Sequence, residues 1–122
     1  MGYWYSINDA DFRIPFANVD EAFRRVRDQK NADGFVSPTP FTLPELLKQV
    51  GFTANVDEAT GDVVIWGGNS KYGFRFPFIA VLGDLVPNGS YVIWRGEEGA
   101  DFVRQIVIDG EVREQRGTVT FA

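Results

Sequence analysis

The sequence predicts an α+β protein: a mainly antiparallel sheet covered on one face by two to three helices. Three observations support this class. Apolar residues recur at helical spacing in three separate stretches before residue 86. Short alternating stretches joined by tight turns fill the last third of the chain, and strands joined in this way pair antiparallel. The chain has 122 residues without a linker or a repeat, so we expect a single domain over residues 1–122.

The first element is expected to be a strand. Tyr3, Tyr5 and Ile7 alternate with Trp4 and Ser6, which is the two-residue period of a strand. The following segment, "ADFRIP", continues in an extended conformation as far as its proline.

A helix is expected next. Asn18 and Glu21 have the spacing of a capping box, which marks the start of a helix. Apolar residues then recur at i, i+3, i+4 and i+7, and the helix is expected to end near Lys30. Its polar face is basic and carries Arg24, Arg25, Arg27 and Lys30.

A second, shorter helix is expected after a loop that contains two prolines. Thr42 and Glu45 repeat the capping-box spacing, and Gly51 stands where a glycine commonly ends a helix. Alternating residues at 52–56 and an apolar run at 63–66, separated by "DEATGD", then predict a β-hairpin.

A glycine-rich loop, "GGNSKYG", precedes a third expected helix, which starts at Pro77 and ends before "VPNGS". The rest of the chain predicts four strands, with "GEEGA", "DG" and "RG" as the turns between them. Of these turns, "DG" is the strongest hairpin signal. The four strands are expected at Tyr91–Arg95, Phe102–Ile108, Glu111–Gln115 and Thr118–Phe121.

The composition excludes several kinds of chemistry. The sequence contains no cysteine and no histidine, so it offers no thiolate nucleophile, no zinc–thiolate site and no imidazole base. Its 17 acidic and 12 basic residues give a net charge of −5, and acidic residues outnumber basic ones in both halves. A basic footprint for nucleic acid is therefore missing. We expect no cofactor and no metal, since "DEATGD" lacks the calcium-loop spacing and "GGNSKYG" lacks the phosphate-loop spacing.

A cluster of carboxylates is the one candidate for enzymatic chemistry. Glu97, Glu98 and Asp101 lie close together in sequence, and paired carboxylates can act as acid and base or bind a divalent cation. The same residues, with Gly96 and Gly99, are typical of a hydrated hairpin tip, and we prefer that interpretation. We therefore expect a protein that is not an enzyme.

Aromatic residues on the expected strands are the most unusual feature. Neighbouring residues on a strand face opposite ways, so helices on one face of the sheet leave some of these rings on the other. An exposed aromatic patch commonly marks a binding surface. The candidate interaction surface consists of Tyr3, Tyr5, Trp66, Tyr91, Trp94 and Phe102, with Arg24 and Arg27 of the basic helix.

The two ends of the chain resemble a known family. The motifs are the opening strand Gly2–Ser6, the segment Arg13–Pro15, and the strands and turns in Gly89–Gly99 and Asp109–Phe121. They are similar to an uncharacterised family of small proteins from actinobacteria and their bacteriophages. Ile93 and Phe102 depart from the family pattern, which has an acid and a tryptophan there. The resemblance implies a small phage or prophage accessory protein and no known activity.

Three functions follow as hypotheses. The preferred one is a non-enzymatic accessory protein that binds a protein partner as a host-factor modulator, an inhibitor or an immunity protein, with homodimerisation as a variant. The alternative is binding of single-stranded nucleic acid through the strand aromatics and the basic helix, although the net charge makes nucleic acid the less expected partner. The third is an enzyme that uses carboxylates. With no apolar span and no secretory signal, we expect a cytoplasmic protein in a bacterial host that does not bind membranes.

Overall fold

The computed structural model describes residues 3–118 and contains one antiparallel sheet. Its strands are arranged in the order β2-β3-β1-β4-β5-β6, so that β2 and β6 form the two edges. The predicted α+β class with an antiparallel sheet is confirmed. The strands are β1 (Trp4–Ile14), β2 (Phe52–Val56), β3 (Val63–Lys71), β4 (Tyr91–Gly96), β5 (Asp101–Ile108) and β6 (Glu111–Thr118).

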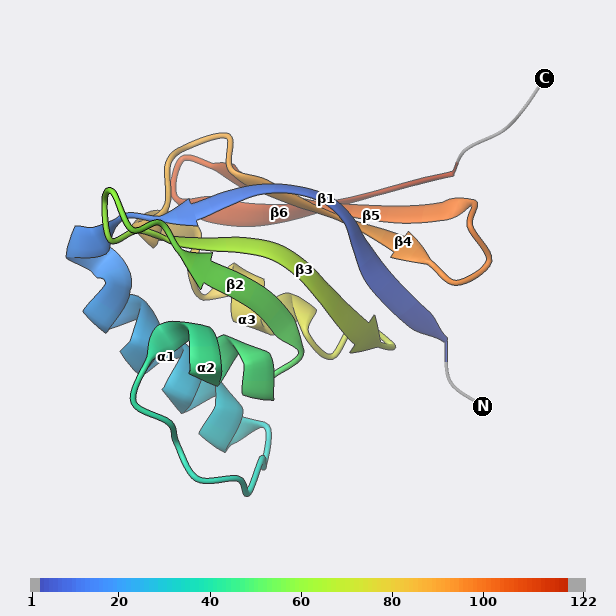
Figure 1. Cartoon of the computed structure of the whole chain (residues 1–122). Helices are drawn as coiled ribbons and strands as arrows, with labels where there is room; N and C mark the ends of the chain where they lie inside the picture. The colour runs from blue at the N-terminus through green and yellow to red at the C-terminus, as the bar shows by residue number, and fades with distance from the viewer. Residues whose placement is uncertain (1–2, 119–122) are drawn as a thin grey trace.

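The helices gather on one side of this sheet (Figure 1). They are α1 (Val19–Ala32), α2 (Leu43–Gln49) and α3 (Phe76–Ala80), with short 3-10 turns η1 (Phe16–Asn18) and η2 (Gly83–Leu85). In Figure 1 all three helices lie below the sheet and none lies above it. The expected covering of a single face is therefore observed, and it leaves the other face of the strands without helices.

The core lies between the helices and the covered face. Trp94 in β4 is completely buried beside Phe76 of α3, with their ring centres 5.0 Å apart. The indole Nε1–H of Trp94 donates to Oε1 of Gln105 at 2.8 Å, and Nε2 of Gln105 donates to the Phe76 carbonyl at 2.9 Å. Gln105 thus satisfies two polar groups inside an otherwise apolar layer, and this fixes the position of Trp94 against α3.

The two predicted capping boxes have different outcomes. At the start of α2, the Thr42 hydroxyl accepts from the Glu45 backbone N–H and donates to the Glu45 carboxylate, as predicted. At the start of α1, the prediction is wrong, because Asn18 makes no side-chain cap. Its amide instead donates to the carbonyl of Leu85, while Glu21 binds arginines of its own helix. A tertiary contact has replaced the local one.

The basic face of α1 contains one residue fewer than the sequence predicts. Lys30 is completely buried, and its Nζ donates to the Ser37 carbonyl and to Oε1 of Gln49, both at 2.7 Å. Neutral oxygens therefore surround this ammonium group and satisfy its donors. The lysine ties the loop between α1 and α2 to both helices.

The third helix and the C-terminal strands also differ from expectation. α3 has only five residues and is followed by the separate turn η2, and β3 continues through much of the expected glycine-rich loop. The two-residue turn at Asp109 and Gly110 is confirmed, with φ angles of 53° and 80°. β6 does not turn at Arg116–Gly117 but runs straight through it. The expected last strand lies, from residue 119 on, outside the described residues.

Candidate functional site

The structure divides the candidate aromatic residues between two sides of the sheet. Trp94 and Tyr5 point into the core, with exposed fractions of 0% and 7%. These two residues must therefore be removed from the predicted interaction surface. Tyr3 is half-buried beside Tyr5, with ring centres 5.2 Å apart, and burial raises its pKa. The physical reason is that an aromatic layer fills the space beneath the short helix α3, and Phe76 extends this layer from Tyr5 to Trp94.

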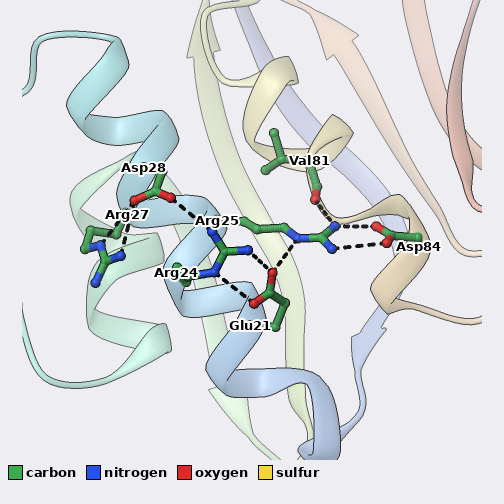
Figure 2. A network of polar contacts seen from close by, with 7 residues as sticks. All are labelled: Glu21, Arg24, Arg25, Arg27, Asp28, Val81 and Asp84. Carbon is green, nitrogen blue, oxygen red and sulfur yellow. Dashed lines mark hydrogen bonds and ion pairs between the residues drawn. The ribbon is translucent and has the colours of Figure 1, made fainter.

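The basic helix face is neutralised by neighbouring carboxylates (Figure 2). Arg24 pairs with Glu21 and Asp28, and Arg27 pairs with Asp28. Arg25 pairs with Glu21 of its own helix and with Asp84 of η2. Hydrogen bonds from Arg24 and then Arg25 lower the pKa of Glu21 to about 2. The basic residues of α1 are therefore occupied within the chain.

The candidate carboxylates near the β4–β5 turn differ in their exposure. Glu97 and Glu98 are exposed. Asp101 is half-buried, and its Oδ2 accepts a hydrogen bond from the Tyr5 hydroxyl at 3.0 Å. None of the three forms an ion pair within the described part of the chain. The structure thus places Glu97 and Glu98 at the surface of the β4–β5 turn and anchors Asp101 to the first strand.

The helix-free side of β4, β5 and β6 carries a mixed apolar and basic surface, which we call the open face. Because strand residues alternate, the buried positions Trp94 and Val103 place their neighbours on this opposite side. The register aligns these neighbours in cross-strand rows, such as Ile93 beside Arg104 and Arg95 beside Phe102. The open face consists of Tyr91, Ile93, Arg95, Phe102, Arg104, Ile106, Arg113 and Gln115.

Phe102 and Ile93 form the apolar centre of the open face. Both are half-buried although no helix covers them. The Arg95 guanidinium lies 6.0 Å from the centre of the Phe102 ring, and Nε of Arg104 donates to Oε1 of Gln115 at 2.8 Å. A surface hollow of about 450 Å³ lies between these side chains and Asn8 in β1, and its wall includes Ile93, Phe102, Arg104 and Gln115.

The charges on the open face are separated by strand. Arg95, Arg104 and Arg113 form no ion pair with any carboxylate in residues 3–118. The adjacent strand β1 carries Asp9 and Asp11, which are exposed and lie opposite Ile93 and Tyr91. The Tyr91 hydroxyl donates to Asp9 Oδ2 at 3.1 Å, and this hydrogen bond raises the pKa of Tyr91. The surface thus carries more basic than acidic groups over β4–β6, where the exposed Glu111 is on the same side of β6, and it is acidic over β1.

Trp66 lies on the same side of the sheet but outside the open face. It is 55% exposed on β3, and β1 separates β3 from β4. Arg13 of β1 pairs with Asp57 and Asp62 of the β2–β3 turn, on the side of β1 that faces away from β4. Hence only Tyr91 and Phe102 of the candidate residues belong to the open face. Arg24 and Arg27 lie with α1 on the opposite side of the sheet, so the structure does not bring the basic helix and the strand aromatics together (Figure 1).

Sequence reasoning missed the arginines and the aliphatic residues of the open face. Ile93, Arg95 and Arg104 were not among the candidate residues. The available signal was the alternation around Trp94: once this residue is known to face the core, Ile93 and Arg95 must face away. The sequence did not show which of the two sides was covered.

The comparisons with known proteins identify no relative. No family model, no curated protein and no solved structure matches the chain. The resemblance to small actinobacterial and phage proteins therefore stays a prediction. Over residues 3–118, no group of three metal-ligating side chains lies close enough to hold a metal ion. None of the helices described is both long and apolar enough to cross a membrane.

Proposed function

We propose that this chain is a non-enzymatic binding module that recognises a protein partner through the open face. The observation that carries the proposal is the combination of a half-buried apolar centre, Phe102 and Ile93, with three arginines that no carboxylate of the described chain neutralises. Interfaces concentrate their binding energy in aromatic and arginine side chains around an apolar centre.

The charge pattern indicates what the partner presents. Arg95, Arg104 and Arg113 favour carboxylates, because guanidinium groups bind them through paired hydrogen bonds. Asp9 and Asp11 on β1 repel acidic groups and favour basic ones at the other border. We therefore expect the partner surface to be apolar at its centre and acidic where it meets β4–β6. Such complementarity fixes the orientation of the partner and accelerates association.

A protein partner explains the open face better than single-stranded nucleic acid does. Base stacking requires aromatic rings in succession along a strand path. The open face offers Phe102 and Tyr91, and the Tyr91 hydroxyl is already bonded to Asp9. The carboxylates of Asp9 and Asp11 would also border the path of a phosphate backbone. The accessory role in phages that the resemblance implies is compatible with this proposal.

The test uses matched charge reversals in a pull-down from a nuclease-treated bacterial lysate. Arg104→Glu changes the open face, and Arg24→Glu makes the same change on α1. The recovered amount of a protein that the wild type retains should fall at least tenfold with Arg104→Glu. The same amount should be recovered with Arg24→Glu as with the wild type. Phe102→Ala should weaken the purified complex by about tenfold, which corresponds to about 1.4 kcal/mol. Equal retention by all variants, or recovery of nucleic acid from an untreated lysate, would contradict the proposal.

A further inference from the structure

Within residues 3–118, the strand β6 is an edge of the sheet, and its outward-facing backbone groups form no backbone hydrogen bond there. It pairs with β5 alone, and a two-residue turn joins the two strands. In such a hairpin the residues that flank the turn, Ile108 and Glu111, exchange backbone hydrogen bonds, and every second residue of β6 does the same. The intervening residues, Val112, Glu114 and Arg116, therefore direct their N–H and C=O groups to the free edge. The other edge, β2, has five residues against the eight of β6.

The side chains of β6 are complementary to those of a second β6 in one antiparallel register. When a two-fold axis perpendicular to the sheet passes beside Gln115, Gln115 faces Gln115 of the second copy. Glu114 then faces Arg116 of the second copy, and the reciprocal pair forms on the other side of the axis. Glu114 and Arg116 are both exposed, and both lie on the same face of the strand because they are two residues apart.

Neighbouring registers bring like charges together. A shift of the axis to Glu114 places two glutamates opposite each other, and a shift to Arg116 or Arg113 places two arginines opposite each other. Like charges directly opposite in a sheet are destabilising. A register centred on Val112 has no such clash but pairs only residues 111–113 of the two strands, whereas the register centred on Gln115 pairs residues 112–118. Charged edges commonly prevent indiscriminate strand pairing. On β6 the charges disfavour every long register except one.

We propose that two copies of this chain pair through β6 in the antiparallel register centred on Gln115. The free N–H and C=O groups of Glu114 bond those of Arg116 in the second copy, and the side chains of these residues form ion pairs across the interface. In the single chain, Arg116 donates a long hydrogen bond of 3.4 Å to the Tyr5 hydroxyl in β1, so its guanidinium turns from Tyr5 towards the edge when it pairs with Glu114 of the second copy. The dimer continues the sheet across the axis and places the two open faces side by side. It does not depend on what the open face binds.

The absence of cysteine from the sequence allows a direct test by disulfide trapping. In the proposed register, Gln115 forms a non-hydrogen-bonded pair with its own copy, with Cα atoms about 4.5 Å apart, a distance that a disulfide spans. Gln115→Cys should therefore form covalent dimers under mild oxidation. Arg113→Cys is the matched control, because its two copies would lie roughly 14 Å apart.

Light-scattering mass determination completes the test. We expect the wild type to have twice the chain mass. Glu114→Arg and Arg116→Glu should each raise the dissociation constant of the dimer at least tenfold. The variant that carries both substitutions should form the dimer again. Near-ultraviolet circular dichroism checks that each variant is folded. A monomeric wild type at high concentration, crosslinking of Arg113→Cys as rapid as that of Gln115→Cys, or a dimer insensitive to both charge reversals would overturn the proposal. These results concern mass and crosslinking only, so they stand apart from the test of the open face.

Discussion

The two faces of β4 and β5 differ in almost every respect although the same short strands form them. On one face, Trp94 and Gln105 are buried under α3 and have all their polar groups satisfied. On the other, Phe102 and Arg104 lie at a surface without helices, and Arg104 has no carboxylate partner in the described residues. Strand alternation thus places the core residues on one face and the residues of the proposed binding surface on the other. An aromatic residue on a strand therefore indicates a binding surface only after its side is known.

The largest expected difference between the faces is in the cost of removing an aromatic ring. Trp94→Ala empties a buried site and should lower the free energy of unfolding by about 3–5 kcal/mol. Phe102→Ala removes a half-buried ring and should cost about 1 kcal/mol. Urea unfolding of the two variants measures both values. Equal losses would mean that Phe102 belongs to the core and that the open face is not a separate surface.

A glutamine on each face gives the second comparison. Gln105→Ala leaves the Trp94 indole N–H and the Phe76 carbonyl without partners inside the core. Each such group costs about 1–3 kcal/mol, so the variant should lose about 2–4 kcal/mol. Gln115→Ala removes an exposed contact to Arg104 and should change stability by less than about 0.5 kcal/mol. Thermal unfolding at neutral pH compares them, and a loss for Gln115→Ala as large as that for Gln105→Ala would contradict the assignment of faces.

The smallest expected effect is on the pH dependence of stability. It concerns the arginines of α1, which form ion pairs, whereas the arginines of the open face form none with any described residue. The folded pKa of Glu21 is about 2, below its ordinary value of 4.5, so its contribution to stability is present above pH 4.5 and is lost as the pH falls towards 2. Arg25 likewise lowers the pKa of Asp84. Stability should therefore decrease between pH 5 and pH 2.

The matched variants are Glu21→Gln and Glu111→Gln, since Glu111 forms no ion pair with any described residue. Thermal midpoints measured across this pH range should fall less steeply for Glu21→Gln than for the wild type, because the variant has already lost the ion pairs of Glu21. Glu111→Gln should keep the wild-type slope. If Glu21→Gln also keeps the wild-type slope, the ion pairs of Glu21 with Arg24 and Arg25 contribute nothing to stability.

Local sequence signals predicted the fold class and many of its elements. The Thr42 capping box and the Asp109–Gly110 turn act over two to four residues, and both form as predicted. Signals that had to compete with tertiary contacts were less reliable. The Asn18 side chain donates to the carbonyl of Leu85 instead of capping its helix. Lys30 is buried and bonds Ser37 and Gln49 instead of facing solvent.

The sequence by itself determined an α+β fold with helices on one side of an antiparallel sheet, because apolar periodicity and turn chemistry are local properties of the chain. Only the tertiary structure decided which side the helices cover. That choice buried Trp94, left Phe102 at the surface and placed Arg25 beside Asp84 of η2. The candidate site could not be read from residue types alone, since the two sides of a strand become different only when other elements pack against one of them.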